Sequence, residues 1–185
     1  MGYRKRVLYV GTEVLGEHLI GPAVDRPDVL DPSVVRGFRS LHRALADPDD
    51  VFEAESTFAV LAEHLARHLG ERTEGATDRQ RDAIAESLRD LLDARVLEGI
   101  TLAEAGRILD VSPAHLVRSF TRRFGISPHR YLVGRRIDVA RGRLLAGHPV
   151  ARVAADVGFH DQAHLTKHFK RHVGTTPASY RGRAA

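Results

Sequence analysis

The sequence contains no cysteine, which excludes disulfide bonds, a thiolate-ligated zinc site and a cysteine nucleophile. Long hydrophobic runs are also missing, because no apolar run reaches the ~18 residues that a membrane-spanning helix needs. The basic segment 2–6 is followed by an apolar run too short for a signal peptide. These absences predict a cytoplasmic protein that makes no membrane contact.

Catalytic motifs are absent as well. Serine, histidine and aspartate are present, but the sequence has neither a nucleophile elbow nor a glycine-rich phosphate loop. No glutamate follows a first histidine in the manner of a zinc protease. We therefore expect a protein that is not an enzyme and that carries no cofactor.

Charge is distributed unevenly along the 185 residues, which are enough for one large domain or two small ones. Residues 1–74 contain 9 Lys and Arg against 13 Asp and Glu, a net charge of −4. Residues 75–185 contain 19 against 11, a net charge of +8. A basic excess confined to one domain is the electrostatic pattern expected of a nucleic-acid-binding domain.

The acidic part, 1–74, is expected to form a small helical-hairpin domain. The pattern predicts a strand at 6–10, a short helix at 12–20 that stops at Gly21-Pro22, and a proline-rich loop at 22–32. Two helices follow, at about 32–45 and 51–69, and residues 70–77 are the expected linker. Their apolar stripes exceed what two helices can hide in each other, so we expect a homodimer formed through residues 31–69. Packing on Val7, Leu8 and Leu19 of the same chain is the alternative.

The basic part, 75–185, contains an internal repeat with an offset of 49 residues. The window 115–131 aligns without a gap with 164–180, and seven of its 17 positions are identical. A repeat of this kind implies one supersecondary module used twice. Helices are predicted at 78–97, 102–109, 113–124, 128–146, 150–157, 161–173 and from 177 onward, with Ser112 and Asp161 as matched N-caps.

The central helix of each repeat has one apolar face and one polar face. Leu116, Phe120 and Phe124 recur at every fourth position in the first unit, as Leu165, Phe169 and Val173 do in the second. The opposite faces contain small, polar and cationic residues, which are the side chains that read base edges in the major groove. The module therefore reads as a helix-turn-helix. The fold expected is mainly α, with two such subdomains joined by a long helix and preceded by the helical hairpin.

Residues 78–181 resemble the DNA-binding domain of the AraC/XylS family of bacterial transcription regulators. The second unit, from Val153 to Arg171 and on through Gly174, Pro177 and Tyr180, is very similar to that family's signature, and the first unit matches it as well. Gly106 is a departure, because the family usually has Ala there, and a helical glycine costs up to ~1 kcal/mol. Residues 3–69 look like the helical part of that family's regulatory domain, without the β-barrel that normally precedes it.

The resemblance implies that two recognition helices, 113–124 and 161–173, enter successive major-groove segments on one side of double-stranded DNA. Nucleoid association and RNA polymerase as a further partner follow from the same resemblance. The DNA-binding residues predicted are Ser112, Ala114, Val117, Arg118, Thr121, Arg122, Gln162, Ala163, Thr166 and Lys167. The family fold also occurs in repair proteins that accept alkyl groups on cysteine, a role that this cysteine-free chain cannot have.

Two other functions remain open from the sequence. One is a protein-interaction module that acts through the hairpin 31–69. The other is a metal or small-molecule sensor, because His160, His164, His168 and His172 recur every four residues, a spacing that could hold Zn²⁺ or Ni²⁺. His164 recurs as His115 in the other unit, which favours a structural role for this position.

Overall fold

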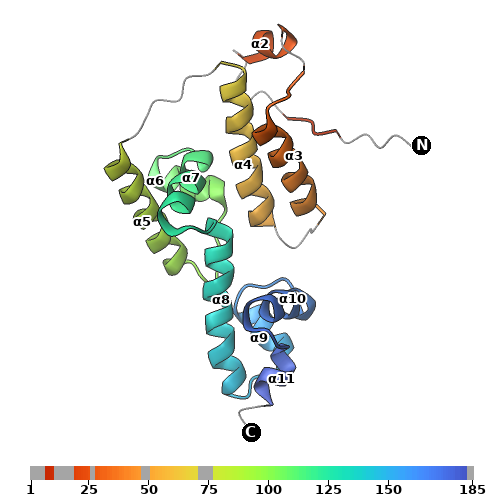
Figure 1. Ribbon diagram of the computed structural model, residues 1–185. Helices are drawn as coiled ribbons and strands as arrows, with labels where there is room; N and C mark the ends of the chain where they lie inside the picture. The colour runs from red at the N-terminus through yellow and green to blue at the C-terminus, as the bar shows by residue number, and fades with distance from the viewer. Residues whose placement is uncertain (1–6, 11–18, 26–27, 47–50, 71–76, 183–185) are drawn as a thin grey trace, which may run out of the picture.

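The computed structural model describes residues 7–10, 19–25, 28–46, 51–70 and 77–182, and every regular element in these parts of the chain is a helix. The mainly α fold predicted from the sequence is confirmed (Figure 1). In chain order the helices are α2 (Ile20–Asp25), α3 (Pro32–Ala44), α4 (Val51–His68), α5 (Asp78–Ala94), α6 (Leu102–Leu109), α7 (Pro113–Phe124), α8 (Pro128–Leu145), α9 (Val150–Asp156), α10 (Gln162–Val173) and α11 (Pro177–Arg181).

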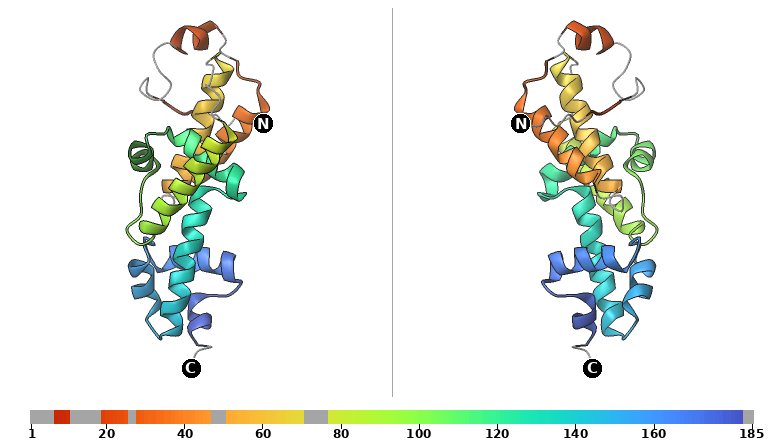
Figure 2. Two further views of the ribbon diagram at one scale, coloured as in Figure 1. Left: turned by 90° about the vertical axis from the view of Figure 1, so that its left-hand side faces the viewer. Right: turned by 90° about the vertical axis from the view of Figure 1, so that its right-hand side faces the viewer.

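Helix α8 joins two helix-turn-helix subdomains, which lie toward its two ends (Figures 1 and 2). Helices α5 and α7 pack on one part of α8, with α6 packed on α5 and α7, and α9 to α11 pack on the other part of α8. The first core includes Leu88, Leu92, Leu116, Phe120 and Leu132, and the second includes Ile137, Leu144, Val153, Leu165 and Phe169. The two phenylalanines are fully buried at equivalent positions of the repeat, as the apolar stripes predicted.

Matched caps fix where α7 and α10 begin and end. The Ser112 hydroxyl accepts a hydrogen bond from the His115 backbone N–H at 3.3 Å, and the Asp161 carboxylate accepts one from the His164 backbone N–H at 2.7 Å. Gly125 and Gly174 terminate the two helices in the left-handed region, with φ of 72° and 79°. The predicted bounds of α7 are confirmed, and those of α10 differ by one residue, because Asp161 is the N-cap and the helix begins at Gln162. Side-chain capping and glycine stops are encoded locally, which is why the sequence predicts these ends well.

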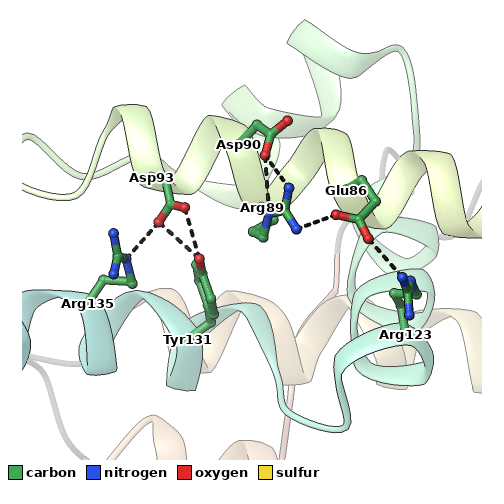
Figure 3. A network of polar contacts seen from close by, with 7 residues as sticks. All are labelled: Glu86, Arg89, Asp90, Asp93, Arg123, Tyr131 and Arg135. Carbon is green, nitrogen blue, oxygen red and sulfur yellow. Dashed lines mark hydrogen bonds and ion pairs between the residues drawn. The ribbon is translucent and has the colours of Figure 1, made fainter.

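Polar contacts join α5 to α7 and α8 in the first subdomain (Figure 3). The Asp93 carboxylate accepts hydrogen bonds from the Tyr131 hydroxyl at 3.0 Å and from Nε of Arg135 at 2.9 Å. Glu86 pairs with Arg123 of α7 at 3.2 Å. The bond to Asp93 raises the pKa of Arg135, while burial and the same carboxylate raise the pKa of Tyr131. Part of the basic excess of this domain is therefore balanced within the domain.

Helices α3 and α4 form the expected antiparallel hairpin. Asp31 caps α3 by accepting from the Ser33 backbone N–H at 2.7 Å. Leu41 and Leu61 are 2% and 4% exposed, and Leu8 packs against their cluster. Leu19 closes a second cluster with Ala66 and Leu69 at the far end of α4. The apolar side chains of the two hairpin stripes are thus buried largely by contacts within the chain.

Two expectations for the N-terminal part are wrong. Residues 7–10 form no strand, because no second strand in the described residues offers them hydrogen-bonding partners. Gly21 and Pro22 do not stop a helix but lie in the first turn of α2, where the missing proline N–H breaks no hydrogen bond. The expected helix 12–20 falls mainly on positions outside the described residues.

The lack of space around position 106 explains why a glycine stands there. A Cβ at this position would lie 2.8 Å from the carbonyl oxygen of Val111 and 3.4 Å from Cδ of Pro113. The clash offsets the gain in helix propensity that an alanine would bring. Ala155, its counterpart in the second unit, is exposed, whereas Gly106 is buried.

Candidate DNA-binding interface

The predicted reading face of α10 is open to solvent. Gln162, Ala163 and Lys167 are exposed, and Thr166 is half-buried with its hydroxyl donating to the Gln162 carbonyl at 2.7 Å. Lys170 is exposed as well and continues this face. The N-terminal turn of a helix carries unsatisfied N–H groups and a partial positive charge, so this end of α10 favours an approaching phosphate.

The equivalent face of α7 is partly covered. Ser112, Thr121 and Arg122 are exposed, and Ala114 is half-buried. Val117 is only 6% exposed, and the Arg118 side chain retains 34% of its exposure. The sequence predicted a solvent-facing row here, so the covering of Val117 and Arg118 is a difference that only the tertiary structure reveals.

Helix α4 is the element that covers α7 (Figures 1 and 2). The Glu63 carboxylate forms an ion pair with the Arg118 guanidinium and a second one, at 2.8 Å, with Arg67 of its own helix. Val117 shares an open groove with Val60 and His64 of α4. These contacts place an acidic and apolar surface directly on the predicted reading face.

Two further carboxylates of α4 contact the basic part of the chain. Glu55 accepts a hydrogen bond from the Leu102 backbone N–H at 3.0 Å, at the first residue of α6. Glu53 lies 3.1 Å from Nδ1 of His129, in the first turn of α8. The hairpin is therefore attached through α6, α7 and α8 at once.

The cations of α7 differ in their surroundings. Burial lowers the pKa of the Arg118 guanidinium, which nevertheless stays charged at neutral pH because an arginine starts from so high a value. Arg122 pairs with Asp78 at the start of α5 at 2.8 Å, but its side chain stays 56% exposed. An exposed ion pair of this kind is weak, so Arg122 can exchange Asp78 for a phosphate at little cost.

Comparison with known proteins places this geometry in a family. A helix-turn-helix domain family matches residues 106–183. The arabinose operon regulatory protein of Escherichia coli (strain K12) is 30% identical over 116 residues, which cover 56% of this chain and 40% of that protein. Residues 106–183 therefore belong to the AraC family of helix-turn-helix domains.

Two further similarities concern the AraC-type domain. The uncharacterized HTH-type transcriptional regulator YbfI of Bacillus subtilis (strain 168) is 32% identical over 127 residues, which cover 69% of this chain and 46% of YbfI. A transcriptional regulator of Chromobacterium violaceum with an AraC-type DNA-binding domain has the same fold, with a TM-score of 0.52, 22% identity, and coverage of 56% of this chain and 93% of that one. The chain spans less than half the length of YbfI and of the arabinose regulator.

Sequence reasoning missed the residues of α4 that contact the AraC-type domain, above all Glu63 and Val60. Helical periodicity predicted which side of α4 faces inward, but it did not predict what the other side of the helix contacts. The opposite net charges of 1–74 and 75–185 were the one signal, because an acidic helix beside a basic domain invites ion pairs.

Two of the four regularly spaced histidines, His164 and His168, pack inside the AraC-type domain, whereas His160, which precedes α10, and His172 are exposed. His164 and His168 are buried, with ring centroids 4.7 Å apart, and the Phe159 ring lies beside both. Across the described ranges no group of three or more His, Asp or Glu side chains could hold a metal ion. No helix in those ranges is long and apolar enough to cross a membrane.

A cleft of about 610 Å³ lies where α4, α8 and both helix-turn-helix subdomains meet. Its apolar lining includes Phe52, Ile100 and Phe159. Arg136 crosses it, with Nε donating to the Val96 carbonyl and Nη1 donating to the Gly158 carbonyl, both at 2.8 Å. These bonds join the two subdomains across α8.

Proposed function

We propose that this chain is a sequence-specific DNA-binding regulator of transcription that inserts α7 and α10 into the major groove of one duplex. The observation that carries the proposal is the exposed N-terminal face of α10, with an amide, a methyl and an ammonium group side by side. The repeat places the same face on α7, at an offset of 49 residues. Similarity to transcriptional regulators supports the proposal.

On α10 each side chain suits a different base edge. The Gln162 amide can form two hydrogen bonds with adenine, and the Lys167 ammonium can donate to guanine. Ala163 and the methyl group of Thr166 suit the thymine methyl. This helix is expected to supply hydrogen-bonded recognition.

On α7 the reading residues are more apolar. Arg118 is the candidate for guanine, while Ala114 and Val117 offer only methyl contacts. Ser112, Thr121 and Arg122 lie where hydroxyl and guanidinium groups can bind phosphate oxygens. This helix is expected to contribute fewer base hydrogen bonds than α10.

We expect Lys167→Ala to weaken binding to the specific site by about 1–3 kcal/mol, which is roughly 5- to 150-fold, and to relax base preference at one position. Binding to random duplex should weaken much less, because a base contact carries sequence information and a phosphate contact does not. Competition binding against every single-base variant of the site measures both effects. Arg152→Ala on α9 is the control, since it removes an exposed cation outside the reading face. Equal losses on specific and random duplex would reassign Lys167 to the phosphate backbone.

The organisation of the whole chain belongs to the same proposal. Residues 1–74 would be a partial regulatory and dimerisation domain, and residues 75–185 the DNA-binding domain. The chain would act on DNA inside the cell by binding rather than by catalysis, with RNA polymerase as a further partner. The regulators to which it is similar support this role.

Homodimerisation through residues 31–69 is supported by apolar side chains that remain exposed on the hairpin, namely Val35 and Leu45, with Val51 at the start of α4. The same residues support the alternative function, a protein-interaction module that acts through this hairpin. Sedimentation of the intact chain at micromolar concentration separates the two. A dimer whose association is weakened by Leu45→Ser supports self-association, and a strict monomer, alone and on DNA carrying two sites, rules it out.

A further inference from the structure

The two repeats provide an internal comparison of the same reading position in a covered and an open state. Val117 corresponds to Thr166, and Arg118 corresponds to Lys167. In the second unit Thr166 is half-buried and Lys167 is exposed, whereas in the first unit Val117 is 6% exposed and Arg118 is paired with Glu63. The difference comes from α4, which packs on α7 and makes no comparable contact with α10.

The contact between α4 and α7 involves the Arg118 side chain, which is also a side chain that DNA would bind. The Arg118 guanidinium presents a fork of donors that suits a carboxylate as well as a guanine edge or a phosphate. The Glu63 carboxylate pairs with this guanidinium, and the Glu63 side chain is only 11% exposed. Because the guanidinium lies between helices, it cannot keep this pair and reach into a groove at the same time.

The residue types on both sides match this contact. The covered position has an apolar Val117 where the open position has Thr166, and Val60 of α4 lines both open grooves that Val117 lines. Three carboxylates of α4 meet the DNA-binding domain at a guanidinium, an imidazole and the N–H group at the start of α6. Guanidinium groups and helix N-termini are also what phosphates bind.

We propose that the α3–α4 hairpin is an intramolecular inhibitor that competes with DNA for the first recognition helix. In the docked form only α10 presents its reading face. In the open form the hairpin has left α7, and both helices can read one site. The inference rests on the proposed function, since it takes α7 to be a DNA-reading helix.

The effect of this competition on the DNA affinity can be measured. If the docked form makes up nine-tenths of the population, the apparent affinity for a complete site is reduced about tenfold. Weakening the hairpin contact should restore that factor for a complete site. It should leave binding to random duplex unchanged apart from the effect of net charge.

The first test uses the double variant Val60→Ser/Glu63→Gln in the full chain, with a duplex that the wild-type chain selects from a random pool. We expect about tenfold tighter binding to the selected duplex. Asp25→Asn is the control for net charge, because it makes the same charge change on the exposed surface of α2. Thermal melting of the variant checks that it folds. Affinities equal to those of Asp25→Asn on both selected and random duplex would overturn the inhibitor.

The second test leaves the contact intact. The chain has no cysteine, so spin labels attach only at Arg39→Cys on α3 and Ser87→Cys on α5, two exposed positions outside the predicted reading face. Saturation with the selected duplex should lengthen the distance between the labels. Specific binding with an unchanged distance overturns the inhibitor but leaves the proposed function intact. Selection of no duplex above random overturns the proposed function and the inhibitor with it.

Discussion

Phe120→Ala and Phe169→Ala are each expected to destabilise the protein by about 3–5 kcal/mol. Both rings are fully buried, and each is a central member of the core of one helix-turn-helix subdomain. The Phe120 ring lies 4.6 Å from that of Phe124 and 5.5 Å from that of Tyr131, while Phe169 lies 5.3 Å from Tyr180. Truncation therefore removes apolar burial and aromatic contacts together and leaves a cavity.

Thermal unfolding measures this effect, and the melting temperature should fall by roughly 6–20 °C for a chain of this size. Leu145→Ala on α8 is the control, because it truncates an apolar side chain that is 50% exposed and should cost no more than ~0.5 kcal/mol. If either phenylalanine variant melted together with the control, the assignment of inner and outer faces on α7 and α10 would be wrong.

Gly158→Ala is the second substitution for which we expect a large effect. Gly158 has a φ of 79°, and a Cβ there would lie 2.7 Å from the carbonyl oxygen of Leu97 and 2.9 Å from Cζ of Arg136. The left-handed backbone conformation would cost an alanine about 1–2 kcal/mol, and the displacement of the neighbouring atoms would cost a further ~1–3 kcal/mol. The sum, roughly 2–5 kcal/mol, should appear in urea unfolding as a lower midpoint.

Gly174→Ala is the matched control for this experiment. Gly174 has the same φ of 79°, but nothing lies within 4 Å of the position of its Cβ. Its replacement should cost only the backbone contribution of about 1–2 kcal/mol. Equal costs for the two alanines would show that the approach of Leu97 and Arg136 to Gly158 does not limit how the two subdomains pack.

The parts of the fold that the sequence predicted well are those that local chemistry determines. Ser112 and Asp161 cap α7 and α10, and the 49-residue repeat supported each boundary with an independent copy. The buried positions of Phe120 and Phe169 followed from the four-residue spacing of apolar side chains. These signals lie within a few residues of the structure that they specify.

Such local signals could not predict that α4 covers Val117 and Arg118. Both lie on the polar side of α7 by periodicity, and a helix face looks the same in sequence whether it meets solvent, DNA or another helix. Glu63 is about 55 residues from Arg118 in the chain, and no periodic pattern relates the two. The short helix α2 was missed because Pro22 was taken to end a helix, although a proline in a first turn is tolerated.

Sequence discrimination by the intact chain at physiological salt is the most direct test of the central claim that the repeated unit reads DNA. The affinity for a duplex selected by the chain should be compared with that for a random duplex of the same length. The exposed face of α10, which we propose reads the bases, predicts a preference of about 10³-fold or more for the selected duplex. A ratio near one would show that the basic domain binds DNA by charge alone, and would contradict the account.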